Sequence, residues 1–253
     1  MTLILQSCPP AERDGWLGRC LDSVAAWARA RGYAYRWLGD ELFNPVPAAL
    51  RDRLEKQAVI ASDLARLRQM QGALESGADA VVWFDADVFV FDPKRLHLPA
   101  TNCAVGRELW IQADAAGRLR TWKKVHNAFL LYRPQASGRN SSLDFYADTA
   151  ERLLGACRGG MPPQFIGPKL LTALHNVVQW PVLEEVGMFS PAVMQDLANG
   201  GGPALELLQR RSAVWPAAAN LCRSCLQRGE LSHADLVSAM ERLTAGVARD
   251  AVS

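Results

Sequence analysis

One stretch, AVVWFDADVFVF from Ala80 to Phe91, constrains the fold more than any other part of the sequence. The residues Val81 to Phe84 are apolar at consecutive positions, which is typical of a strand buried on both faces of a parallel sheet. Asp85 and Asp87 follow directly, before the chain becomes apolar again. Ligands of open α/β sheets bind beyond the carboxyl ends of the strands, and we expect these aspartates to lie there.

The two aspartates predict a site for a divalent cation. Two carboxylates about 6 Å apart repel by roughly 3 kcal/mol at an effective dielectric of ~20, and a cation that also binds phosphate oxygens removes this repulsion. The chain has 15 aspartates, so an Asp-x-Asp pattern is expected about once by chance. The prediction of a cation site therefore depends on the position of this pattern at the end of a buried strand. The alternative is a turn in which the aspartates cap backbone amides.

Composition places the chain among ordinary globular proteins. The 253 residues, 49% hydrophobic and 21% charged, suffice for one large α/β domain or two small ones. A formal net charge of +2 gives no electrostatic reason to expect a nucleic-acid partner. Neither a secretory signal nor an apolar stretch of about 18 residues is visible, so we expect no transmembrane span.

The six cysteines predict a reducing compartment, the cytoplasm, in which all of them are free thiols. Cys222 and Cys225 form a single C-x-x-C pair without a second pair at zinc spacing. We expect these thiols on a helix face, and a structural zinc site completed by His233 is the alternative.

The first ninety residues predict a β-α-β-α-β opening, which makes a parallel sheet. We expect strands at Thr2–Gln6 and Tyr33–Leu38, an amphipathic helix between them, and a long helix from Leu50 to Glu75 ahead of the strand with the aspartates. This order is typical of a nucleotide-binding half of a doubly wound fold. No Gly-x-Gly-x-x-Gly and no Walker lysine follows the first strand, which argues against dinucleotide oxidoreductases and P-loop enzymes.

Further strands are expected at Cys103–Leu109 and Val125–Tyr132, and a helix at Ser142–Leu154. The sequence NGGGP, Asn199–Pro203, predicts a flexible hinge. We therefore expect one α/β domain over residues 1–202, which carries the site, and a helical C-terminal segment, residues 203–253, packed on the same domain.

Four short motifs, in order along residues 56–191, resemble those of a known enzyme family. They are Ser62-Asp63 with Arg66 ahead of Asp85-Ala86-Asp87, then Asn127-Ala128-Phe129, Gly167-Pro168 with Leu171-Thr172, and Phe189-Ser190-Pro191. The set is similar to the DXD-containing sugar transferases of the GT-A fold. That family includes initiating α-1,6-mannosyltransferases, capsular polysaccharide enzymes and glucosylating toxins.

The resemblance implies a GT-A-like fold, with a mixed, mostly parallel sheet flanked by helices, and a hexosyltransferase that uses Mn²⁺ or Mg²⁺. Asp87 would bind the metal directly, and Asp85 would hold it through water or reach the ribose. Asp63 would accept hydrogen bonds from donor-sugar hydroxyls, and Arg66 would hold the sugar or the phosphate. The alternative for Asp63 and Arg66 is an exposed i,i+3 ion pair on a helix.

The resemblance also places Asn127 at the catalytic site and implies that Gln6 and Ser7, at the end of the first strand, bind the nucleotide. The donor would be a UDP- or GDP-sugar, and the acceptor a glycan, a lipid-linked sugar or a small molecule, with retention at the anomeric carbon. Polysaccharide biosynthesis is the implied process. A peripheral contact with a membrane is compatible with this reading, whereas a nucleic-acid partner is not expected.

Some features depart from the family pattern or leave alternatives open. The family has Gly-Gly ahead of its DXD strand, whereas this chain has only Gly77. The third metal ligand is open among His175, Asn220 and His233. His126 is expected either to touch the acceptor or to be satisfied by its neighbours. The indoles of Trp110 and Trp122 are expected either to stack on a sugar or to pack.

Two other functions remain as alternatives. A nucleotidyltransferase shares the βαβ opening and acidic metal ligands, but the segment QSCPPAERDG offers only Arg13 and Gly15 in place of a glycine-rich basic loop. A non-catalytic sugar- or partner-binding module on a transferase fold is the second alternative.

Overall fold

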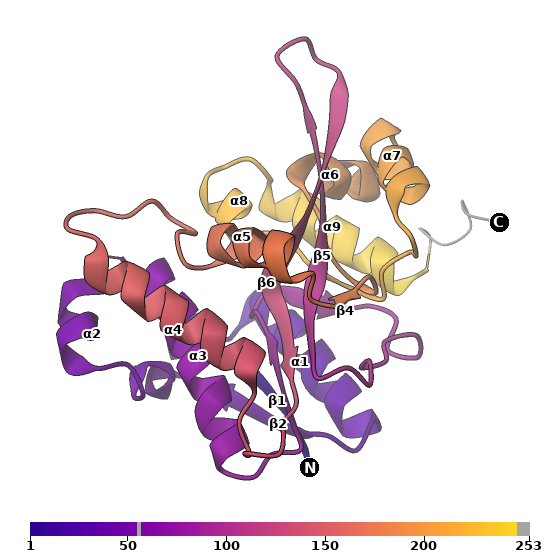
Figure 1. Cartoon of the computed structure of the whole chain (residues 1–253). Coiled ribbons are helices and arrows are strands. Elements are labelled where there is room, and N and C mark those ends of the chain that lie inside the picture. The colour runs from indigo at the N-terminus through magenta and orange to yellow at the C-terminus, as the bar shows by residue number, and fades with distance from the viewer. Residues whose placement is uncertain (55–56, 247–253) are drawn as a thin grey trace.

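The structure is a computed structural model that describes residues 1–54 and 57–246 (Figure 1). A central sheet of six strands has the order β2-β1-β3-β6-β5-β7. Its strands are β1 (Thr2–Ser7), β2 (Ala34–Leu38), β3 (Ala80–Phe84), β5 (Cys103–Ala113), β6 (Leu119–Tyr132) and β7 (Val182–Leu183). Only β6 runs antiparallel to its neighbours β3 and β5, while the β1–β2, β1–β3 and β5–β7 pairs are parallel. The expected mixed, mostly parallel sheet is confirmed.

Strand β3 is fully buried because helices cover both faces of the sheet. Val81 and Trp83 point into a core shared with α3 (Ala58–Glu75), α4 (Ser141–Ala156) and α5 (Pro168–Val178). Val82 and Phe84 point to the opposite face, where α1 (Gly15–Ala30) packs. Alternate side chains of a strand face opposite ways, so a strand buried on both sides needs the continuous apolar run that the sequence shows.

The long helix expected over residues 50–75 is wrong as a single element. The structure has α2 (Ala48–Leu54) and α3 (Ala58–Glu75), and Gln57 before α3 adopts a non-helical backbone, with φ −130° and ψ 51°. The apolar periodicity continues across this break, which explains why the pattern predicts one helix. Residues 55 and 56 lie outside the described part of the chain.

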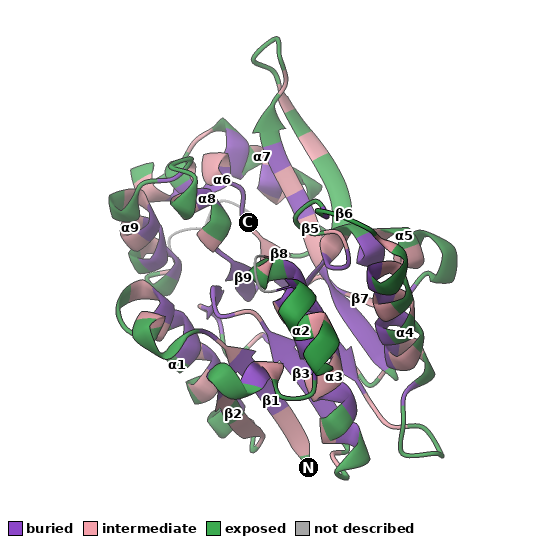
Figure 2. Ribbon diagram, turned by 90° about the vertical axis from the view of Figure 1, so that its left-hand side faces the viewer, coloured by how far each residue is buried: buried purple, intermediate pink, exposed green. Residues whose placement is uncertain are grey.

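Strands β5 and β6 form a hairpin that is longer than the two expected strands. Its far end projects well beyond the rest of the fold (Figure 1), and exposed residues form its tip (Figure 2). Beyond Ile111 the sequence turns polar and charged, so the apolar pattern ends there although the backbone pairing continues. Cross-strand hydrogen bonds need no apolar side chains.

A second, smaller sheet has the order β4-β9-β8. It brings together β4 (Val88–Val90), β8 (Val186–Met188) and β9 (Ala218–Asn220). Strand β4 follows the two aspartates directly, and it pairs antiparallel with β9, for example Val88 with Asn220. The C-terminal part of the chain is therefore joined by backbone hydrogen bonds to the segment after the acidic pair.

The remaining elements enclose a core of their own. Helices α6 (Pro191–Asn199), α7 (Pro203–Arg211) and α9 (His233–Thr244) pack with Leu109 and Ile111 of β5. Short helices are α8 (Arg223–Gln227) and the 3₁₀ turns η1 (Pro10–Glu12) and η2 (Asp40–Phe43). The boundary expected at residue 202 stays a prediction, and residues 247–253 of the expected C-terminal segment lie outside the described residues. Among the helices described, none is long and apolar enough to cross a membrane.

Candidate functional site

The sheet holds Asp85 in a fixed position at the carboxyl end of β3. Its backbone N–H donates to the carbonyl of Ala128 on β6 (2.9 Å), and its own carbonyl accepts from Nε2 of Gln6 on β1 (3.1 Å). Its carboxylate Oδ1 accepts from the indole Nε1 of Trp83 (2.7 Å). Three neighbouring strands therefore place this carboxylate at the edge where ligands of such sheets bind.

Arg66 of α3 connects two carboxylates. Its Nη1 lies 2.8 Å from Oδ1 of Asp85, and its Nη2 lies 3.0 Å from Oδ1 of Asp63. The guanidinium also lies over the ring of Trp83, with 5.3 Å between its central carbon and the ring centre. Arg66 is 7% exposed and Asp63 is 3% exposed, so the alternative of an exposed ion pair on a helix is wrong.

Asn127 reaches these residues because the hairpin pairing is interrupted at this point. The partner of β5 shifts from Leu130 to His126 between Val105 and Gly106, so residues 127–129 form a bulge. The Asn127 side chain donates from Nδ2 to Oδ1 of Asp63 (2.9 Å), and its backbone carbonyl accepts from Arg66 (3.0 Å). Asp63, Arg66, Asp85 and Asn127 thus form one hydrogen-bonded group, called the Arg66 cluster below.

Two buried polar atoms of the Arg66 cluster have no hydrogen-bond partner within the part of the chain that is described: Oδ2 of Asp63 and Nε of Arg66. Burial raises the pKa of Asp63 to about 6, although Arg66 and the Asn127 amide act to lower it. Gly167, at the start of α5, lies against the same carboxylate, and a Cβ there would stand 2.4 Å from Oδ2. Buried acceptors are rarely left unfilled, so a water or the hydroxyl of a ligand would satisfy Oδ2.

Asp87 is held by the segment that follows β9. Its Oδ1 accepts from Nδ2 of Asn220 (2.6 Å), and its Oδ2 accepts from the backbone N–H of Arg223 (2.8 Å). Its backbone carbonyl accepts from the N–H of Leu221 (2.9 Å). Sequence reasoning missed Arg223 and Leu221 as contacts, because a backbone N–H has no residue-specific pattern that could reveal it.

The carboxylate of Asp87 is buried, and no cationic side chain of the described residues contacts it directly. No ion pair within 4.0 Å connects it to a cationic side chain in residues 1–54 and 57–246, and the guanidinium of Arg223 pairs with Glu12 instead. Burial, together with the charge of Asp85, raises the pKa of Asp87 to about 6. A buried carboxylate with only neutral donors leaves a site that favours a cation.

The donor set fits a divalent cation held by few protein ligands. The described residues contain no group of three or more His, Cys, Asp or Glu side chains that could hold a metal. Of the three candidates for a further ligand, Asn220 contacts Asp87, whereas His233 is exposed on α9 and His175 is on α5. Mg²⁺ is commonly bound by one or two carboxylates together with substrate phosphates and water, so Asp85 and Asp87 suffice.

Gln6 and Ser7 lie at the end of β1, where Gln6 contacts Asp85 of the Arg66 cluster. Gln6 is fully buried, and its amide connects Asp85 to the hydroxyl of Tyr35, which donates to Oε1 (3.1 Å). Ser7 is half-buried and pairs with Leu38 of β2. The nucleotide contact expected for these two residues stays a prediction.

His126 is satisfied by its neighbours. Its Nδ1 accepts from the backbone N–H of Ala128 (3.2 Å), which leaves Nε2 to donate to the carbonyl of Val186 (3.2 Å). Burial lowers its pKa to about 4, so the ring is neutral at physiological pH. The ring also fills the space above Gly106, where a Cβ would come within 2.2 Å of it. This geometry supports the structural role among the two alternatives.

The expectation of six free thiols is wrong for two of them. Cys222 and Cys225 form a disulfide, while Cys8, Cys20, Cys103 and Cys157 are free. The two residues meet because the chain turns into α8 between them, which brings their Cα atoms to 5.3 Å. The N–H of Cys222 donates to Oδ1 of Asn220 (2.8 Å), so the disulfide closes the same segment that holds Asp87.

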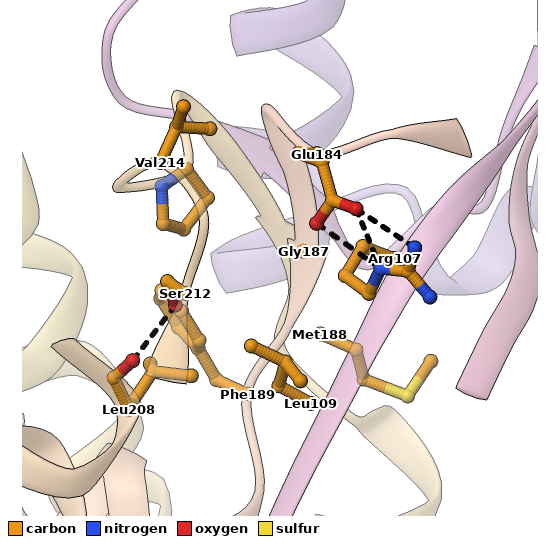
Figure 3. A pocket seen from close by; sticks show the side chains of 10 residues that line it. Arg107, Leu109, Glu184, Gly187, Met188, Phe189, Leu208, Ser212 and Val214 are labelled. Atoms are coloured by element: carbon orange, nitrogen blue, oxygen red, sulfur yellow. Dashed lines mark hydrogen bonds and ion pairs between the residues drawn. The ribbon is translucent and has the colours of Figure 1, made fainter. Parts of the chain in front are cut away.

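A shallow surface hollow lies elsewhere, between β5, β8 and the segment after α7 (Figure 3). Its volume is about 270 Å³, which includes space that is open to solvent. Arg107 and Glu184 form a bidentate ion pair on one side, with Nε of Arg107 at 2.9 and 3.0 Å from the two carboxylate oxygens. Apolar side chains such as Leu109 and Phe189 line the rest. It includes neither Asp87 nor any member of the Arg66 cluster.

No protein-family model matches the sequence, and no curated protein matches it. Several solved structures align with most of the chain. A glycosyltransferase involved in glycosylation of the major capsid of PBCV-1 covers 96% of this chain and 98% of its own, at 11% identity and a TM-score of 0.48.

Two further solved structures are of the same general class. The galactosyltransferase LgtC, in complex with donor and acceptor sugar analogues, covers 98% of this chain and 95% of its own, at 16% identity and a TM-score of 0.45. Mouse xyloside xylosyltransferase 1 covers 88% and 99%, at 10% identity and a TM-score of 0.43. At such low TM-scores and identities, the chain's own residues must support any statement about its chemistry.

Proposed function

We propose that the protein is a metal-dependent glycosyltransferase that moves a hexose from a UDP- or GDP-sugar to a glycan, lipid-linked or small-molecule acceptor. One observation carries the proposal. Asp63, Arg66, Asp85 and Asn127, which are far apart in the sequence, meet in one buried cluster at the carboxyl end of β3, with Asp87 two residues beyond. The motif resemblance assigns Asp63, Arg66, Asp85 and Asp87 to donor and metal binding and Asn127 to the catalytic site.

Asp85 and Asp87 would hold Mn²⁺ or Mg²⁺. The bound cation would neutralise the charge that develops on the diphosphate leaving group. Asp87 suits this role because the donors that contact its carboxylate, the Asn220 amide and the Arg223 N–H, are neutral. In Asp85, Oδ1 already accepts from Arg66 and Trp83, which leaves Oδ2 for the metal or a water on it.

The Arg66 cluster would bind the donor sugar. Oδ2 of Asp63 is the unfilled acceptor that a sugar hydroxyl would satisfy. Arg66 and Asn127 fix the direction of that carboxylate through its other oxygen, so the hydroxyl is oriented as well as bound. Retention at the anomeric carbon, which the resemblance implies, requires no dedicated general base from these residues.

A second reading is a structural role for Asp87, in which it only caps the segment after β9. Its hydrogen bond from the N–H of Arg223 favours this reading. The two readings predict different consequences for Asp87→Asn. A metal ligand that loses its charge loses metal-dependent nucleotide binding, whereas a cap that loses one acceptor costs about 1 kcal/mol of folding stability and leaves ligand binding unchanged.

Calorimetric titration of Mn²⁺ with UDP, and separately with GDP, into wild type and Asp87→Asn tests the proposal. We expect binding of at least one nucleotide to wild type only in the presence of Mn²⁺, and at least a tenfold loss in the variant. Asp79→Asn is the matched control, since Asp79 is an exposed aspartate at the opposite end of the same strand. Equal binding to wild type and Asp87→Asn would end this mechanism. Hydrolysis of a panel of nucleotide sugars with Mn²⁺ then identifies the donor.

A further inference from the structure

Tyr146 of α4 is a fully buried tyrosine whose hydroxyl binds backbone rather than another side chain. It is 1% exposed, and its ring centre lies 6.2 Å from that of Trp180. Its hydroxyl lies 2.9 Å from the carbonyl of Ile166 and 3.2 Å from that of Gly167, so the two carbonyls share one proton. Burial, together with the charge of Asp63, raises the pKa of Tyr146 well above its ordinary value. The hydroxyl is therefore a donor at physiological pH.

The two carbonyls belong to the backbone that leads into α5. Gly167 is the N-cap of this helix, and no side chain caps it. The Gly167 carbonyl also accepts from the N–H of Leu171 (2.9 Å), whereas among the described residues the carbonyl of Ile166 accepts from Tyr146 alone. The preceding loop residues 162–164 are exposed. The Tyr146 hydroxyl is thus the polar side-chain contact that fixes this backbone.

The same backbone lies against the carboxylate of Asp63. A Cβ at Gly167 would stand 2.4 Å from Oδ2 and 2.9 Å from Oδ1. Oδ2 is also the oxygen of Asp63 that has no hydrogen-bond partner within the described chain. A ligand hydroxyl that binds Oδ2 must share its space with Gly167, so the position of this backbone decides how much room the hydroxyl has.

We propose that Tyr146 is a positioning residue for the donor sugar, because its hydroxyl fixes the Ile166–Gly167 backbone against Asp63. The carboxylate is then restrained on both sides. Other members of the Arg66 cluster bind its Oδ1, and the Gly167 backbone limits the movement of its Oδ2. A binding group that is already held in place loses less freedom when the ligand arrives. The inference rests on the proposed function, since it assumes a sugar hydroxyl at Oδ2.

Tyr146→Phe removes the hydroxyl and keeps the ring in the core. Tyr132→Phe is the matched control, because Tyr132 is buried in the same core and its hydroxyl has no hydrogen-bond partner among the residues described. Hydrogen exchange followed by mass spectrometry should show faster exchange of peptides that cover α5 and its N-cap in Tyr146→Phe, and no change there in Tyr132→Phe. This measurement needs no ligand. Unchanged exchange in Tyr146→Phe would overturn the proposal.

Calorimetric titration with Mn²⁺ present separates the sugar from the nucleotide. The two probes are the nucleotide sugar that wild type hydrolyses fastest and its parent nucleotide, UDP or GDP. Tyr146→Phe should bind the nucleotide within about twofold of wild type and the nucleotide sugar about fivefold more weakly, the effect of one hydrogen bond. Tyr132→Phe should bind both probes like wild type. Loss of both affinities by the same factor, or of neither, would overturn the proposal.

A double-mutant cycle shows whether Tyr146 acts through Asp63. Asp63→Asn alone should weaken binding of the nucleotide sugar. Adding Tyr146→Phe should weaken it by less than about twofold more, because the carboxylate that Tyr146 positions is already gone. Full additivity of the two losses would contradict the proposal. Wild type that binds neither UDP nor GDP with Mn²⁺ would refute the proposed function and this role together, whereas failure of this role alone leaves nucleotide binding intact.

Discussion

The Nη1 atom of Arg66 lies 2.8 Å from a carboxylate oxygen of Asp85, and this contact ties helix α3 to the end of strand β3. The same guanidinium binds Asp63, so one cation serves two carboxylates. Asp87, two residues after Asp85, forms no ion pair within 4.0 Å with a cationic side chain in the part of the chain that the structure describes. This uneven distribution of charge favours a metal cation beside Asp87 and a neutral sugar hydroxyl beside Asp63.

Arg66→Lys should disrupt the Arg66 cluster although it keeps the positive charge. A lysine ammonium cannot bridge Asp63, Asp85 and the Asn127 carbonyl with the geometry of a guanidinium. Breaking a buried ion pair commonly costs about 3–5 kcal/mol, and a retained charge reduces that cost, so we expect a loss of roughly 2–3 kcal/mol of unfolding free energy. Urea denaturation measures it, and donor binding should fall in parallel. A loss below about 0.5 kcal/mol would contradict the buried bridge.

Gly167→Ala should be destabilising because its Cβ would stand 2.4 Å from Oδ2 of Asp63. That carboxylate cannot move aside without losing its bonds to Arg66 and Asn127. We expect a loss of about 1–3 kcal/mol, as for overpacking elsewhere in protein cores. Gly155→Ala is the control on α4, where nothing lies within 4 Å of an added Cβ. It should be neutral or stabilising by up to about 1 kcal/mol.

The raised pKa of Asp63 predicts a particular pH dependence of stability. A carboxyl whose pKa is about 6 when folded, and near 3.9 when unfolded, binds its proton more tightly in the folded state. Its contribution to stability is therefore present below about pH 4 and is lost as the pH rises to about 6. The stability of wild type relative to Asp63→Asn should fall by on the order of 2–3 kcal/mol across that interval and then level off.

Denaturant titrations of both proteins at several pH values provide the measurement. The difference between the two proteins removes the contribution of groups that do not interact with Asp63, including His126 and Asp87. A relative stability of wild type that rises between about pH 4 and 6 would show that Asp63 has a lowered pKa, contrary to its burial.

Thiol titration of unreduced, denatured protein should find four free thiols, and six after reduction. The disulfide closes the segment that supplies Asn220, Leu221 and Arg223 to Asp87, so its loss should loosen that carboxylate. Cys222→Ser/Cys225→Ser should bind Mn²⁺ and nucleotide severalfold more weakly than wild type. Cys157→Ser, a free thiol outside this segment, is the control. Six reactive thiols in the absence of reductant would contradict the disulfide and support the expectation that all six cysteines are free.

Local patterns predicted much of the fold. The apolar run Val81–Phe84 can be satisfied only by a strand covered on both faces, and the structure buries it in this way. The first βαβ unit and the helix at residues 141–156 also follow from periodicity and from residues that begin or end helices. Periodicity failed at Gln57, where an apolar pattern continues across a break in the helix.

The sequence predicted which residues form the candidate site, but it did not predict which of them contact one another. The sequence by itself determined that Asp85 and Asp87 follow a buried strand, because hydrophobicity and alternation are local properties. Only the tertiary structure decided that a bulge in β6 brings Asn127 to Asp63, and that β9 returns to hold Asp87 with Asn220 and the N–H of Arg223. Such contacts depend on strand register and on backbone donors, and neither is encoded in a short pattern of side chains.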